Sequence, residues 1–324
     1  MDDAQLVAAV LAGDRTAYAA LYDRYADRIH DFGASILRNR ADASDALQVT
    51  FLIAFEALDA LAQPARLRSW LYAIAHRAVL DRIEGEGRLP GRDGGQVGDL
   101  IPGPGSTEPR LSRAELAEFV WQAAGGLPQR DQILLDLHLR QGLEERDLAG
   151  AAGVPVAQLD PVLERLEAQS ERALGALLVA RTGRRSCPSL SGILGEWDGQ
   201  LTPEFRDRVT AHVDDCELCN SRRRIAPSPL GLLAATPMAP APAYLRSVVL
   251  GKAELEALER TGADGSGRML ASAGWAFGGD GFPDLRGGDR PRPVVPARPV
   301  HPRSPPPAVS APTAPGPRIG IGSE

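Results

Sequence analysis

Apolar residues recur at helical spacing along the first 88 residues, with polar residues at the positions between them. Three such stripes can be traced, over residues 18–29, 47–58 and 67–78. Each stripe predicts an amphipathic helix, and each helix needs partners to bury its apolar side. Residues 1–88 are therefore expected to form a compact helical domain.

The pattern stops over residues 89–112, where glycine and proline predict a flexible linker. Helical spacing returns over residues 113–180. Within this range, the small residues of 149–153 are followed by an apolar stripe at 159–166. Small residues where two helices cross, with a glycine at the turn, are typical of a helix-turn-helix. We expect this motif in the second domain.

A third helical unit is predicted over residues 181–224, from short apolar stripes that begin at Leu190 and at Phe205. Residues 225–324 are expected to be largely disordered, because eleven of the chain's 27 prolines lie between 291 and 317. A possible amphipathic helix at 244–259 interrupts this tail. The predicted fold class is all-α: two helical domains, a small helical unit and a disordered proline-rich tail.

Charge and cysteine content narrow the class of protein. The net charge of −6 excludes a globally basic nucleic-acid binder but leaves a local basic face open. Three cysteines are too few for a disulfide framework and fit a reducing compartment. The N-terminus lacks the basic start of a signal peptide, and no apolar run is long enough to span a membrane. A cytoplasmic protein with no membrane partner is expected.

The third unit holds all three cysteines. His212 and Cys216 are four residues apart near a predicted helix end, Cys219 follows across a turn, and Cys187 lies upstream. Three thiolates and one imidazole fill a tetrahedral Zn²⁺ site with no open position, which predicts a structural zinc ion. Free thiols beside a surface histidine are the alternative. A DNA-reading zinc finger is rejected because the preceding helix is not basic, and oxidation of the thiolates with loss of metal stays open.

Several segments resemble the extracytoplasmic-function sigma factors of RNA polymerase. "GDRTAYAALYDRY", "DASDALQVTFLIAFEAL" and "LRSWLYAIAHRAVLD" are similar to the promoter-melting domain, and "LPQRDQILLDLHLRQGLEERDLAGAAGV" is similar to the second domain. The resemblance covers about residues 5–178. It implies that Asp45, Gln48 and Phe51 bind the clamp of the polymerase core's largest subunit. It also implies that the helix opened by Trp70 handles the −10 strand of promoter DNA.

The residues of that helix suit single-stranded DNA, because arginines neutralise phosphates and aromatic rings stack on unpaired bases. The candidate DNA-binding residues are Arg66, Arg68, Trp70, Tyr72, His76, Arg77 and Arg82. The alternative is that Trp70 belongs to the core and the arginines form a solvated face.

Two departures from the family concern DNA contact. Glu84 and Gly85 stand where the family carries consecutive arginines. Residues 127–180 contain five arginines against nine acids, Pro161 is expected to interrupt or reset the recognition helix, and Arg165 is the one basic residue left there. An acidic helix adds to phosphate repulsion, so recognition of a −35 element is doubtful.

The unit around "HVDDCELC" resembles the zinc-binding anti-sigma domain, whose additional helix would correspond to 244–259. The expected function is a sigma factor that binds polymerase core and promoter DNA, with a fused zinc domain that modulates it through intramolecular contact. The alternative is a sigma-like interaction protein that occupies polymerase or sequesters another regulator without reading promoters. No motif supports an enzyme: there is no glycine-rich phosphate loop, nucleophile elbow or paired carboxylate motif.

Overall fold

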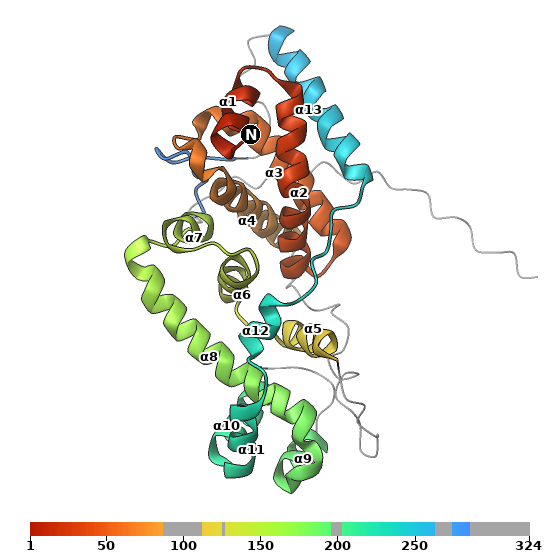
Figure 1. Cartoon of the computed structure of the whole chain (residues 1–324), viewed down its shortest axis with the longest axis vertical. Helices are drawn as coiled ribbons and strands as arrows, with labels where there is room; N and C mark the ends of the chain where they lie inside the picture. Colours follow the sequence, from red (N-terminus) through yellow and green to blue (C-terminus); the bar gives the residue numbers. More distant parts are fainter. Residues whose placement is uncertain (87–111, 125–126, 196–202, 263–273, 286–324) are drawn as a thin grey trace, which may run out of the picture. The chain divides into compact units, whose positions relative to one another are not determined.

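The first domain consists of four helices: α1 (Asp3–Leu11), α2 (Arg15–Leu37), α3 (Arg40–Ala57) and α4 (Leu67–Glu86) (Figure 1). The computed structural model describes residues 1–86, 112–124, 127–195, 203–262 and 274–285. Asp2, Asp14 and Asn39 begin the first three helices, because their side chains accept hydrogen bonds from backbone N–H groups that lack partners within the helix. The expected all-α class is confirmed, since the described residues form no strand beyond one isolated bridge.

The second domain follows as α5 (Arg113–Ala124), α6 (Gln129–Leu135), a π-helical turn (Asp136–Arg140), α7 (Glu145–Ala152) and α8 (Val156–Gly183). Gly153 takes the left-handed conformation (φ +69°) that ends α7, which gives the predicted turn. Pro161 does not interrupt α8, contrary to expectation. The 28-residue helix continues through it, because a single proline near the start removes only one backbone hydrogen bond.

The remaining helices are α9 (Pro188–Gly195), α10 (Pro203–Asp215), α11 (Glu217–Ile225), α12 (Pro229–Ala234) and α13 (Tyr244–Gly262). A 3-10 turn (Arg184–Ser186) joins α8 to α9. Because α8 extends to Gly183, the boundary expected between residues 180 and 181 falls inside a helix. Within the described ranges, no helix is long and apolar enough to cross a membrane.

Buried apolar residues form two clusters that cut across the expected domains. One joins α1–α4 to α6, α7, the start of α8 and α13, together with Trp275 and Phe282. The other joins α5 and the C-terminal half of α8 to α9–α12, and includes Cys187 and Cys219. Helix α5, expected in the second domain, packs on α8 of that domain and on α12, and its Phe119 and Val120 belong to the same buried cluster as Cys187 and Cys219. The cysteine-containing unit (residues 181–224) therefore shares its buried core with the second domain.

The chain beyond residue 225 contains more ordered structure than the expected tail. The helix predicted at 244–259 is present as α13, and α12 and residues 274–285 also pack on the helical domains. Leu232, Leu233, Leu245 and Val249 are at most 1% exposed. These apolar side chains have no core of their own and are buried against other helices. The proline-rich stretch after residue 285 lies outside the described residues.

Candidate functional site

The expected DNA-binding residues of α4 are mostly buried. Trp70 and Tyr72 are 0% exposed, Arg77 is 3% exposed and His76 is 6% exposed. The ring and guanidinium groups that were expected to meet a DNA strand thus contact other parts of the chain. Burial agrees with the alternative that Trp70 is a core residue, although its ring N–H points to a later segment and not to the first domain.

Helix α7 and the turn before it contact α4 and bury part of its surface. Ser69 Oγ donates to the carbonyl of Asp147 at 2.6 Å, and Tyr72 OH donates to Gln141 Oε1 at 2.7 Å. His76 Nδ1 lies 3.0 Å from the carbonyl of Ala151 and acts as the donor. Burial lowers the pKa of His76 to about 4, so the ring is neutral near pH 7. In this arrangement His76 offers no positive charge to DNA.

The expected DNA-binding arginines are paired with acids or with backbone carbonyls. Arg82 lies 2.6 Å from Asp42 and 3.0 Å from Asp45, both on α3. Arg66 Nε donates to Asp147 at 2.8 Å, and Arg68 donates to the carbonyl of Gln141. Arg165 stays exposed on α8. The structure thus brings most of the predicted DNA-binding side chains together on α4, but it turns them toward protein partners.

The three expected polymerase-binding residues of α3 do not lie on one exposed face. Phe51 is 0% exposed, its ring packs on Tyr22 at 4.7 Å, and it is therefore a core residue and not a surface contact. Asp45 and Gln48 are half-buried at the surface. Lys252 of α13 donates to Gln48 Oε1 at 3.2 Å, so α13 borders the position where the polymerase contact was expected.

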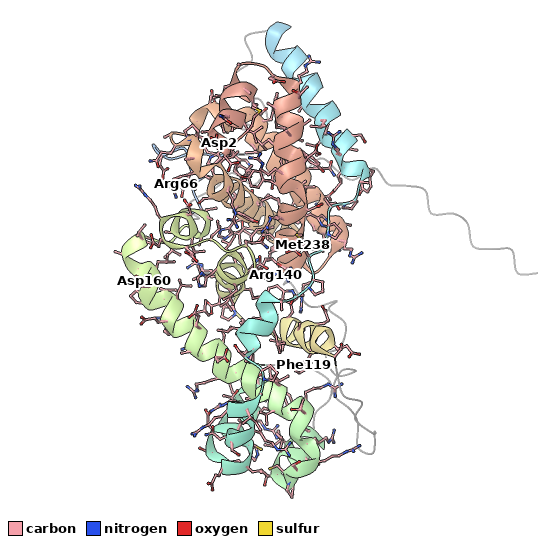
Figure 2. The ribbon with its side chains drawn as sticks, viewed as in Figure 1. Asp2, Arg66, Phe119, Arg140, Asp160 and Met238 are labelled. Carbon is pink, nitrogen blue, oxygen red and sulfur yellow. The ribbon has the colours of Figure 1, made fainter. Side chains whose placement is uncertain are left out.

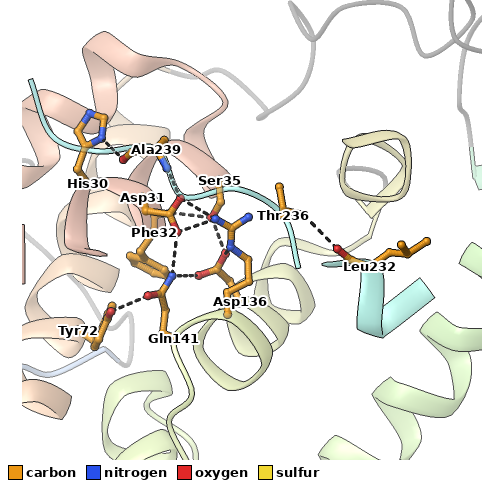
Figure 3. Close-up of polar contacts among 11 residues, drawn as sticks. His30, Asp31, Phe32, Ser35, Tyr72, Asp136, Gln141, Leu232, Thr236 and Ala239 are labelled. Atoms are coloured by element: carbon orange, nitrogen blue, oxygen red, sulfur yellow. Dashed lines mark hydrogen bonds and ion pairs between the residues drawn. The ribbon is translucent and has the colours of Figure 1, made fainter. Parts of the chain in front are cut away.

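A buried charge cluster of Asp31, Asp136 and Arg140 joins α2 to the π-helical turn of the second domain (Figures 2 and 3). Arg140 Nη2 lies 2.6 Å from each carboxylate oxygen of Asp31, and Arg140 Nε lies 3.4 Å from Asp136. The guanidinium also lies over the ring of Trp121, 5.2 Å from its centroid. The backbone N–H of Ala239 donates to Asp31 at 2.9 Å, which ties the chain before α13 to the same cluster.

One cation faces two acids in this cluster, and Asp136 also accepts hydrogen bonds from neighbouring side chains. Ser35 Oγ lies 2.7 Å from Asp136 Oδ2 and 2.8 Å from the carbonyl of Phe32, yet a hydroxyl has only one hydrogen to donate. The Ser35 hydroxyl therefore donates to either the Asp136 carboxylate or the carbonyl of Phe32. Gln141 Nε2 donates to the other oxygen of Asp136 at 3.0 Å. Burial raises the pKa of Asp136 to about 7.

The raised pKa of Asp136 makes stability depend on pH in a defined direction. Below about pH 7 the folded chain holds a proton on Asp136, whereas the unfolded chain releases this proton above the ordinary aspartate pKa of 3.8. The stabilisation is complete below that value and is lost as pH rises through about 7. Asp136→Asn mimics the neutral acid. We expect the free energy of unfolding of the variant, measured by urea denaturation, to rise relative to that of the wild type as the pH is raised from about 5.5 to about 8. Parallel pH dependence of the two proteins would contradict this.

The four predicted metal ligands come together between α8 and α11. The Sγ atoms of Cys187, Cys216 and Cys219 and a ring nitrogen of His212 all lie within 4.8 Å of one another. His212 Nε2 is 3.3 Å from Cys187 Sγ and 3.5 Å from Cys219 Sγ. These separations match the edges of a tetrahedron around an ion with metal–sulfur bonds of ~2.3 Å and metal–nitrogen bonds of ~2.0 Å. The residues present therefore fit Zn²⁺.

The electrostatics of the cluster also suit a cation. A hydrogen bond from the backbone N–H of Cys219 lowers the pKa of the Cys216 thiol. Burial and the neighbouring thiols raise the pKa of Cys219 to about 12. Three thiolates at these distances repel one another, and a divalent cation offsets that repulsion. The backbone N–H of Leu190 donates to Cys187 Sγ at 3.4 Å.

Sequence reasoning missed the buried charge cluster and residues 274–285. A signal for the first exists: Asp136 stands within the apolar run "ILLDLHL", where an ionisable residue must find buried partners. Its partner Asp31 is more than a hundred residues away and has no such signal. The aromatic residues Trp275, Phe277 and Phe282 in a glycine-rich stretch were a weaker signal of local order.

The family Sigma-70 region 2 matches residues 21–89, which include most of α2 and all of α3. The ECF RNA polymerase sigma factor SigM of Mycobacterium tuberculosis is 30% identical over 175 residues, which cover 54% of this chain and 86% of the relative. The RNA polymerase sigma-H factor of Pseudomonas aeruginosa is 27% identical over 54% of this chain and 95% of the relative. The ECF RNA polymerase sigma-E factor of Haemophilus influenzae is 23% identical over 55% of this chain and 98% of the relative. The chain belongs to the extracytoplasmic-function family of RNA polymerase sigma factors.

Proposed function

We propose that this chain binds RNA polymerase core and directs promoter recognition in transcription initiation, and that its own C-terminal region holds it in a closed form. The position of α13 carries the proposal, because this helix packs along α3 and α2 (Figure 1). The polymerase clamp is expected to bind the same face through Asp45 and Gln48. The clamp and α13 then compete for one surface.

The contacts of α13 are those of a docked amphipathic helix. Leu245 and Val249 are 0% exposed and Ala253 is 3% exposed, and all three lie on the side that faces the first domain. At the rim, Arg246 pairs with Asp23 at 2.7 Å. Apolar burial supplies the attraction, and the rim pair helps to fix the register. Covalent linkage gives α13 an effective concentration on the order of millimolar, so modest affinity suffices to keep it bound.

The zinc ion in this proposal is structural and belongs to an anti-sigma-like unit. Cys187, His212, Cys216 and Cys219 would hold it, and no position would remain for a substrate. Its ligands join the end of α8 to α10 and α11. By fixing these helices on α8, the metal would define where the chain leaves the unit toward α12 and α13. Modulation of the sigma domains then depends on an intact metal site.

The alternative function, a sigma-like interaction protein that does not read promoters, is favoured by the start of α8. Asp160, Glu164 and Arg165 are exposed there, which leaves an acidic surface on the expected recognition helix. Such a protein would bind polymerase core without producing a transcript. Reconstituted transcription with core enzyme separates the two functions, provided that the closed form has been released.

Val249→Asp is the variant that releases α13. A carboxylate cannot stay unpaired against the apolar side of α3, so α13 should leave its site. The apparent affinity for polymerase core is reduced by the fraction of chains that are closed, and we expect Val249→Asp to raise it at least about ten-fold. Binding to immobilised core enzyme measures this, together with transcription from candidate promoters.

Ser247→Asp provides the matched control, because it adds the same charge to the exposed side of the same helix. We expect it to bind core enzyme like the wild type. Equal affinities for Val249→Asp and Ser247→Asp would contradict competition between α13 and the clamp. Tighter core binding by Val249→Asp without any transcript would favour the alternative function.

A further inference from the structure

Residues 274–285 form a self-contained turn with internal hydrogen bonds. The backbone N–H of Gly278 donates to the carbonyl of Phe282 at 2.8 Å, and Asp284 N–H donates to Ala276 at 2.9 Å. Asp280 accepts a hydrogen bond from the N–H of Phe282 at 3.1 Å, which closes the tip. These bonds fix the direction of the aromatic side chains on either side of the turn. The 274–285 segment therefore presents a defined surface to α4.

The segment contacts the arginines and the tryptophan that were expected to bind DNA. Trp70 Nε1 donates to the carbonyl of Gly281 at 2.6 Å. Arg77 donates through Nη2 to the carbonyl of Gly274 at 2.7 Å and through Nη1 to that of Asp284 at 3.3 Å. Helix α4 supplies the hydrogen-bond donors here, and the 274–285 segment supplies the carbonyl oxygen atoms that accept from them.

Aromatic rings of the segment lie on the guanidinium planes of the same face. Arg77 lies over the ring of Trp275, 4.6 Å from its centroid, and Arg66 lies over the ring of Phe282 at 4.4 Å. Trp275 stacks on Phe277 with 6.3 Å between their centroids. A single DNA strand offers the same two features, because its bases stack on guanidinium planes and its phosphate oxygens accept from arginine.

We propose that the 274–285 segment is an internal occupant of the strand-binding face of α4, so that a single DNA strand binds there only after the segment has left. This proposal rests on the proposed sigma function and extends it from the polymerase face to the DNA face. The segment acts through Trp70, Arg77 and Arg66, whereas α13 acts through α3. Two separate parts of the C-terminal region thus cover two separate surfaces of the first domain.

The fit of the segment depends on one glycine. Gly281 has φ +81°, and a Cβ added to it would lie 2.1 Å from the carbonyl oxygen of Ala60. No side chain can be accepted at that distance without moving the turn. Gly279, two residues earlier, has no atom within 4 Å of an added Cβ. The two glycines form a matched pair in which only one substitution disturbs docking.

The experiment compares Gly281→Ala with Gly279→Ala in the full chain, with zinc bound. Hydrogen exchange of residues 274–285 reports docking, and fluorescence anisotropy of a labelled mixed-sequence DNA single strand reports binding. We expect Gly281→Ala to raise exchange in the segment and to tighten strand binding at least about ten-fold. Gly279→Ala should match the wild type in both measurements. Adding Arg66→Ala to Gly281→Ala should weaken strand binding again.

Two results would overturn the proposal. Equal exchange in both glycine variants would mean that the segment is not docked on α4. Faster exchange in Gly281→Ala with unchanged strand binding would mean that the segment covers no DNA-binding surface. Core binding by the same proteins is scored separately. If polymerase core is never bound while Gly281→Ala still gains strand affinity, the sigma function fails and the masking by the segment stands.

Discussion

Replacing Cys219 with serine is expected to reduce bound zinc from about one equivalent per chain to near zero and to unfold α9–α11. The helices α9 and α11 have eight and nine residues, too few to be stable without tertiary support. Metal coordination in small domains contributes ~10 kcal/mol, and we expect its loss to outweigh the apolar contacts that these helices make with α8. Metal analysis and hydrogen exchange over α9–α11 measure the two effects.

Ser221→Ala is the control for this prediction, because Ser221 lies on the same helix two residues from Cys219 and provides no ligand atom. Its zinc content and exchange pattern should equal those of the wild type. An unchanged zinc content in Cys219→Ser would refute the metal site itself. Loss of zinc without faster exchange in α9–α11 would refute its structural role.

The second large effect is expected for Arg140→Met. Removing the Arg140 guanidinium leaves Asp31 buried beside Asp136 without a cation. Removing one partner of a buried ion pair costs ~3–5 kcal/mol of stability. The pair lies between α2 and the second domain, so the loss weakens the contact between the two domains. Urea denaturation gives the free energy of unfolding, and fluorescence energy transfer between probes on α2 and α8 gives the distance between the domains.

Arg172→Met is the matched control for Arg140→Met. Arg172 and Asp214 are also 2.6 Å apart, but the Arg172 side chain is 61% exposed, whereas that of Arg140 is 5% exposed. Solvent screens an exposed pair, so we expect a much smaller loss of stability. Adding Asp31→Asn to Arg140→Met should restore part of the stability, because it removes the uncompensated charge. Equal losses in the two arginine variants would show that burial of the pair has no energetic consequence.

Because the second buried cluster includes helices on both sides of residue 180, a truncated chain is a poor way to study the sigma domains. A chain ending at residue 180 would keep Phe119, Leu174 and Leu177 but would lose the helices α9–α12 that cover them. Exposed apolar residues of this kind favour aggregation. Point variants such as Val249→Asp and Gly281→Ala are expected to uncover the proposed polymerase and DNA faces while the cysteine-containing core stays complete. They are therefore better tests than truncation.

Local signals in the sequence were enough to predict most of the helices and the convergence of the cysteine and histidine side chains. Apolar periodicity placed α2, α3, α4 and α13, because a 3.6-residue repeat is a property of a few consecutive turns. The grouping of His212, Cys216 and Cys219 within eight residues also predicted that these side chains would converge, and the structure brings Cys187 to them. The sigma family resemblance rested on contiguous segments in the same way.

The burial of the α4 residues and the docking of α13 on α3 could not be read from these local patterns. Trp70 and Arg77 look the same in sequence whether they face DNA or the carbonyl of Gly281, more than 200 residues away. The pairing of Asp31 with Arg140 and the docking of Val249 on the first domain are likewise contacts between distant segments. Their free energy depends on shape and charge across two surfaces, which no periodic pattern encodes. The sequence by itself determined most of the helices, the grouping of three cysteines with one histidine and the family, whereas only the tertiary structure decided which surfaces the chain covers with its own C-terminal region.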